Sequence, residues 1–147
     1  LVYPADGQLD VPTAWSGNES PDPLPPGAAR PVGYPFTLQG VGGNLVVDWA
    51  EMRTAEGQVI GVHPNPPLCP QFNCYALIPL QPLSPWSTYT VTAQGSVGGV
   101  AFIQSWTFST GAGTSSAGLI GLQGEHFSPA LPQALITGNL SGQVNSD

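Results

Sequence analysis

The chain has 147 residues, about one domain's worth, and 41% of them are hydrophobic while only 7% are charged. The formal charge is −7, and Arg30 and Arg53 are the only cationic side chains apart from histidine, which excludes nucleic acid and anionic membrane surfaces as partners. No apolar stretch approaches the roughly eighteen residues that a spanning helix needs, so we expect no membrane insertion.

Glycine and proline divide the sequence into many short segments, which is typical of an all-β protein. Residues 1–35 contain eight prolines, which remove backbone donors and fix φ. This Pro-rich N-terminal segment therefore cannot be a helix or a central strand. We expect an extended edge segment followed by an ordered loop, and then a short strand at 36–39.

From Leu45 the sequence alternates, which predicts a strand with Leu45, Val47 and Trp49 on the core side. Residues 50–57 could instead form a short helix ending at Gly57. We favour a turn at Glu56–Gly57 and a second strand at 58–63, because β-branched residues flank the turn. A proline-rich loop around the cysteines and a strand at 75–78 follow.

The strongest strand pattern covers residues 88–110. Tyr89, Val91 and Ala93 alternate with threonines, and after a glycine-rich turn Trp106 and Phe108 alternate with serine and threonine. The short connection predicts an antiparallel hairpin with one buried face and one hydroxyl-rich face.

Beyond this hairpin the composition changes. A Gly/Ser linker and an extended tail occupy 112–147, so we divide the chain into a body, 1–111, and this tail. The tail's apolar runs are too short to fold alone, so we expect them to dock on the same or a neighbouring subunit. The docking residues are Leu119, Ile120, Leu122, Leu135 and Ile136.

Cys69 and Cys74 lie five positions apart. We expect a disulfide, worth about 2 kcal/mol for so short a loop, which indicates an oxidising, extracytoplasmic compartment. Two free thiols are the alternative. A metal site would need further ligands, and neither His63 nor His126 sits in a ligand pair, so no metal or other cofactor is expected.

Two segments resemble a known family. The sequence Pro82-Leu-Ser-Pro85, followed by Tyr89-Thr-Val91 and by Trp106-Thr-Phe-Ser-Thr110, resembles the closing hairpin of bacterial immunoglobulin-like domains. The opening, from Tyr3-Pro-Ala-Asp-Gly-Gln8 to Val11-Pro12, resembles a module that accompanies secreted CAP-type (cysteine-rich secretory) domains. The resemblance implies an Ig-like antiparallel β-sandwich over 1–111 and brings no catalytic residues.

The residues give little support to an enzyme. The chain has no Gly-x-Ser-x-Gly elbow. Asp6, Asp10, Glu19 and Asp22 lack the spacing of a calcium loop. Trp106 and Trp49 are expected in the core. Trp15 and Trp86 lie in loops, where they are candidates for a sugar-binding platform, although covering the end of the body is the simpler role.

We therefore expect a non-catalytic extracellular or cell-surface structural module. It would bind copies of itself or another surface protein, with the tail completing a neighbour's sheet edge in a self-assembling filament. The alternative is a carbohydrate-binding accessory domain of a secreted protein.

Overall fold

The protein is all-β. The computed structural model describes residues 1–17 and 19–113, so the predicted docking residues of the tail lie outside the described residues. The described elements are β1 (Val2–Tyr3), β2 (Gln8–Val11), β3 (Ala14–Trp15), β4 (Val32–Gly33), β5 (Phe36–Gln39), β6 (Leu45–Thr54), β7 (Val62–His63), the 3-10 helix η1 (Cys69–Phe72), β8 (Cys74–Pro79), β9 (Thr88–Val97) and β10 (Val100–Thr110).

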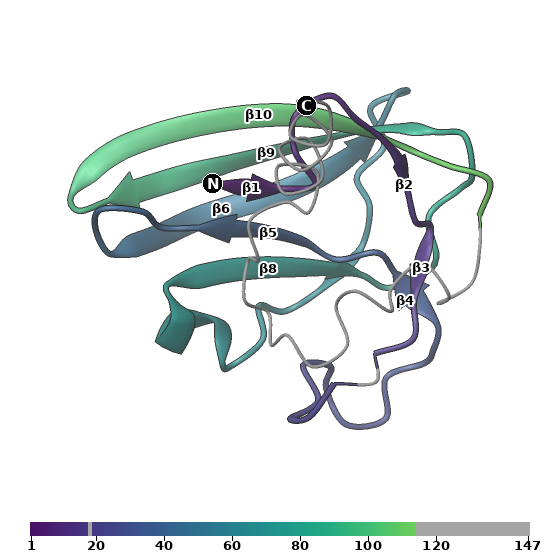
Figure 1. Cartoon of the computed structure of the whole chain (residues 1–147), viewed down its shortest axis with the longest axis horizontal. Helices are drawn as coiled ribbons and strands as arrows, with labels where there is room; N and C mark the ends of the chain where they lie inside the picture. Colours follow the sequence, from purple (N-terminus) through teal and green to yellow (C-terminus); the bar gives the residue numbers. More distant parts are fainter. Residues whose placement is uncertain (18, 114–147) are drawn as a thin grey trace, which may run out of the picture.

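Two four-stranded sheets enclose the core (Figure 1). One, the β5–β8 sheet, has the order β1-β5-β8-β7, and the other, the β9–β10 sheet, has the order β2-β10-β9-β6. Neighbouring strands are antiparallel except β2, which runs parallel to β10. A small third sheet, β3-β4, belongs to the loop region before β5.

The predicted hairpin is confirmed. Strands β9 and β10 pair antiparallel through a two-residue turn, in which Gly98 and Gly99 have the positive φ that such turns require. Tyr89, Val91 and Trp106 are at most 3% exposed, so the alternation correctly identified the buried face. Serine and threonine side chains occupy the other face, where Thr92 and Ser105 hydrogen-bond at 2.8 Å.

The prediction that Trp49 faces the core is wrong. The register of β6 against β9 shifts between Val47 and Trp49, so Asp48 is an extra residue in the strand. Because such a bulge reverses the alternation of faces, Met52 becomes the buried residue of β6 and Trp49 is 42% exposed. The indole of Trp49 donates a hydrogen bond to Gln94 on the neighbouring strand.

The expected strand at 58–63 is only partly formed. The turn at Glu56–Gly57 is present, with the Gly57 N–H donating to the Thr54 carbonyl at 2.9 Å. Val59 then makes a single bridge to Arg53, after which the chain crosses to the other sheet as β7. The predicted strand therefore divides between two sheets.

The Pro-rich N-terminal segment also divides between the sheets. Its first two strands, β1 and β2, are edge strands of the two large sheets, as expected. Strand β1 pairs with β5, whereas β2 pairs with β10. Pro4 lies between the two strands and Pro12 follows the second. Strand β3, which follows β2, carries Trp15, which is only 4% exposed and belongs to the main core cluster.

One asparagine connects the two sheets at the end of the molecule where the β9–β10 turn lies. Asn73 follows η1 with a left-handed backbone (φ 55°). Its side chain accepts a hydrogen bond from the Leu45 N–H at 2.7 Å and donates to the carbonyls of Gly40 and Gly43. These bonds hold the β5–β6 connection against the start of β8.

The core predicts a large effect for Trp106→Ala. The side chain is 2% exposed and belongs to the main core cluster, so its removal should destabilise the fold by about 3–5 kcal/mol in chemical denaturation. Trp86→Ala is the matched control, because Trp86 is 72% exposed and its loss should change stability by no more than about 0.5 kcal/mol. Equal midpoints for the two variants would contradict the assignment.

Candidate interaction site

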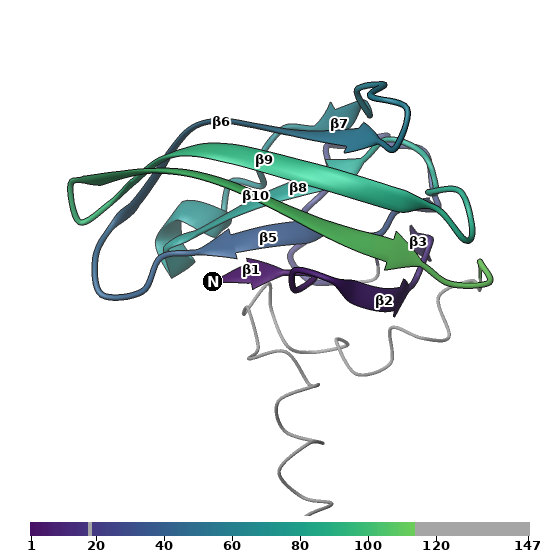
Figure 2. The same cartoon turned by 90° about the horizontal axis from the view of Figure 1, so that it is seen from above.

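The outer edge of β10 is paired along only part of its length (Figure 2). Strand β2 contacts it at Phe108 and Thr110. Just before this point, Thr107 donates its N–H to Asp6 Oδ1 at 2.9 Å, and its carbonyl accepts from the Gly7 N–H at 2.7 Å. The main-chain groups of Thr107 therefore point away from β9 and are satisfied by the N-terminal segment.

Main-chain direction alternates along a strand, so Ala101, Ile103 and Ser105 also point their N–H and C=O groups away from β9. The even-numbered residues of β10 point the opposite way: the Thr110 N–H, for example, donates to the Ser87 carbonyl on the β9 side. Within residues 1–17 and 19–113, no hydrogen bond satisfies the outward groups of these three residues. Among the described residues, the side of 100–105 that faces away from β9 is thus unpaired, and we call it the open edge.

The open edge is apolar and carries no formal charge. Ile103 is 74% exposed and Val100 is 73% exposed. No Asp, Glu, Lys or Arg occurs anywhere in residues 57–113. Proteins normally protect such edges with charged side chains, proline, bulges or very short strands, and the open edge has none of these.

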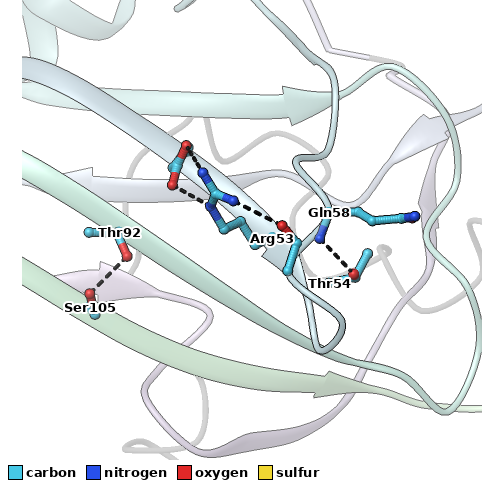
Figure 3. Close-up of polar contacts among 7 residues, drawn as sticks. Arg53, Thr54, Gln58, Thr92 and Ser105 are labelled. Carbon is cyan, nitrogen blue, oxygen red and sulfur yellow. Dashed lines mark hydrogen bonds and ion pairs between the residues drawn. The ribbon is translucent and has the colours of Figure 1, made fainter.

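The other edge strands of the two large sheets are short or carry charge. Strand β2 has four residues and includes Asp10. Strands β1 and β7 are two residues long. Strand β6 carries the bulge at Asp48 and an ion pair between Arg53 and Glu51 at 2.6 Å. Figure 3 shows that Arg53 also donates to the main chain of the following turn, where the Gln58 N–H bonds to Thr54 Oγ1. In the described part of the chain, β10 is therefore the edge best suited to accept another strand.

The structure has Cys69 and Cys74 as free thiols rather than the expected disulfide. Cys69 is 1% exposed and Cys74 is 5% exposed, and Cys74 Sγ donates to the Cys69 carbonyl at 3.2 Å. The hydrogen bond to the Cys74 sulfur, together with burial, raises the pKa of the Cys69 thiol. The two sulfurs are adjacent, so the disulfide stays a prediction for the oxidised protein.

Of the two candidate sugar-binding tryptophans, only Trp86 has an exposed ring. Trp15 is buried, whereas Trp86 lies in a loop and is 72% exposed. The main-chain N–H of Trp86 donates to the Gly111 carbonyl. The structure therefore does not provide a platform that combines the two.

Two of the four acidic residues considered for calcium, Asp6 and Asp22, have structural partners instead. Asp6 bonds Thr107, as described above. Asp22 accepts from the Leu24 N–H at 3.0 Å and forms an ion pair with Arg30. Desolvation pushes the pKa of Asp22 upward, but these hydrogen bonds bring it below its ordinary value. Across the described residues, no three His, Cys, Asp or Glu side chains converge as metal ligands.

Comparison with known proteins identifies no relative: no protein-family model and no curated protein matches the sequence. The resemblance to bacterial immunoglobulin-like domains therefore stays an expectation. In the described residues, no helix is long and apolar enough to cross a membrane.

Sequence analysis missed the open edge, although one signal for it is present. The charge-free run at 57–113 is visible in the sequence, but only strand order reveals which part of the run lies at an edge.

Glu19 should make stability depend on pH. The carboxyl is half-buried, and desolvation raises its pKa from 4.5 to about 7. Because the folded-state pKa exceeds the unfolded one, its contribution is fully present below pH 4.5 and is lost as the pH rises through about 7. Glu19→Gln should reduce this loss in denaturation curves measured across that range. Glu56→Gln, at an exposed turn, controls for net charge, and an unchanged slope in Glu19→Gln would refute the prediction.

The cysteine pair gives a second prediction. Protein oxidised with glutathione disulfide, then denatured and treated with an alkylating agent, should carry no label on Cys69 or Cys74, whereas reduced and denatured protein should carry both labels. Intact mass spectrometry measures the difference. Two labelled cysteines in the oxidised, denatured sample would show that the bond does not form.

Proposed function

We propose that this chain is a non-catalytic extracellular structural module with an immunoglobulin-like fold, which associates with copies of itself by adding a strand to a sheet edge. The observation that carries the proposal is the open edge at residues 100–105. Its unpaired main-chain groups and exposed Ile103 offer both hydrogen bonds and apolar area to an incoming strand.

The strand order supports the immunoglobulin-like assignment. The order β1-β5-β8-β7 corresponds to strands ABED of that fold, and β10-β9-β6 corresponds to GFC. The first segment of the chain contributes β1 to one sheet and β2 to the other. Tyr89, near the start of the strand equivalent to F, accepts a hydrogen bond from the Ser84 N–H at 2.8 Å, as the tyrosine corner of this fold does.

The roles of the polar residues support binding rather than catalysis. Asp6 and Asp22 satisfy main-chain N–H groups, and Arg53 neutralises Glu51. The charge-poor, hydroxyl-rich surface and the adjacent cysteines are typical of an extracellular or cell-surface location.

The donor strand expected from sequence is the tail, with Leu119, Ile120, Leu122, Leu135 and Ile136 as its docking residues, and this stays a prediction. The alternative function, a carbohydrate-binding accessory domain, now depends on Trp86 because Trp15 is buried. With only one of the two candidate rings exposed, glycan binding is supported less well than strand addition at the open edge.

The proposal predicts concentration-dependent self-association of the full chain. Sedimentation velocity from about 1 µM to about 1 mM covers the range of weak interfaces, and the average mass should rise across it. The open edge carries no charge, so added salt should not weaken the association. A monomer at every concentration would overturn the proposal.

A further inference from the structure

We propose that the partner of the open edge is the same edge of a second copy, paired antiparallel across a two-fold axis beside Ile103. This inference rests on the proposed function, self-association by strand addition, and specifies what occupies the edge. It joins the β9–β10 sheets of two copies into one continuous sheet.

The position of the outward main-chain groups determines the register. Ala101, Ile103 and Ser105 are the residues of the open edge that point away from β9. When Ile103 faces Ile103 of the second copy, Ala101 faces the second copy's Ser105, and Ser105 faces the second copy's Ala101. All three are then hydrogen-bonded pairs, each exchanging two N–H to C=O bonds.

The ends of the open edge exclude other registers. A one-residue shift places outward-pointing groups opposite inward-pointing ones. A two-residue shift in one direction brings the second copy onto Thr107, whose main-chain groups Asp6 and Gly7 already satisfy. In the other direction it reaches the Gly98–Gly99 turn, where the strand has ended. The register centred on Ile103 is the one that uses every unpaired group.

The side chains fit this arrangement. Two isoleucines lie side by side at the axis, where β-branched pairs stabilise sheets, and Ala101 and Ser105 are small. The charged residue nearest the open edge is Asp6, which is bonded to Thr107. Thr107 lies four residues along β10 from the axis in each copy. The two carboxylates are therefore about 27 Å apart, well beyond the screening length of about 8 Å at physiological salt.

A second copy suits the edge better than the tail because β10 is already ordered. The β9 ladder holds it as a strand, so pairing costs no backbone ordering, whereas the tail would first have to be fixed in an extended form. The two-fold contact uses the same surface on both copies and closes at a dimer. A tail inserted into a neighbour would instead propagate into a filament.

Ile103→Pro tests the edge without breaking the sheet. It removes an N–H that points away from β9, and proline is tolerated at such edge positions. Ile103→Lys tests it independently by placing two like charges opposite each other. Both variants should dimerise at least tenfold more weakly than the original chain. Val41→Lys is the control, because Val41 is a 63% exposed loop residue outside the edge, and it should dimerise normally.

Amide hydrogen exchange tests the register directly. The N–H groups of Ala101, Ile103 and Ser105 should gain protection as the protein concentration rises. The Thr107 N–H, already bonded to Asp6, should change little. Thermal melting of dilute samples establishes that both Ile103 variants are folded.

A chain ending at Gly113 separates the two occupants. We expect it to form the same dimer as the full chain. If it is monomeric while the full chain forms open-ended polymers, the tail occupies the edge, which overturns this inference but leaves the proposed function standing. If both folded Ile103 variants dimerise like the original chain, the edge is not the interface and the inference is wrong. A full chain that is monomeric throughout refutes the inference and the proposed function together.

Discussion

The first eleven residues of the chain form edge strands in both large sheets, although they are only long enough to make one full strand. Strand β1 supplies hydrogen bonds to β5 and strand β2 supplies them to β10. Because each part is short, neither sheet receives a full-length edge strand. The open edge at 100–105 is the direct result. Residues 2–3 pair with β5 in the other sheet, whereas a longer β2 would have run beside β10 and covered this edge.

The same segment sets the limit of the open edge. Asp6 and Gly7, between β1 and β2, satisfy the main-chain groups of Thr107 before regular pairing begins at Phe108. The short carboxylate of Asp6 thus completes the ladder where the chain itself cannot. Within the described residues, the outer side of β10 before Thr107 has no partner. Because this stretch is only a few residues long, a stable association requires a partner strand that is already ordered.

Charged side chains protect one edge of the β9–β10 sheet against pairing with other strands but not the other edge. Acidic and basic side chains in the described residues lie on the N-terminal segment, its loops, and β6 with the turn that follows, while 57–113 carries none. Strand β6 therefore presents Asp48, Glu51 and Arg53 at its edge, whereas β10 presents Ile103 and hydroxyl-bearing neighbours. The contrast between two edges of one sheet indicates that only one of them must avoid other strands.

The sequence by itself determined the all-β class and the strongest strands. Alternation identified β9, β10 and their buried residues, and proline content correctly assigned the N-terminal segment to sheet edges. It could not place Trp49, because the bulge at Asp48 depends on how β6 meets the glycine at position 95, where a side chain would collide with the Val46 carbonyl. It could not divide 58–63 between two sheets. Nor could it locate the open edge, because the composition of β10 does not reveal its neighbours. Periodicity records which face of a strand is buried, whereas strand order arises from packing between distant segments, and only the tertiary structure decided which main-chain groups remain unpaired.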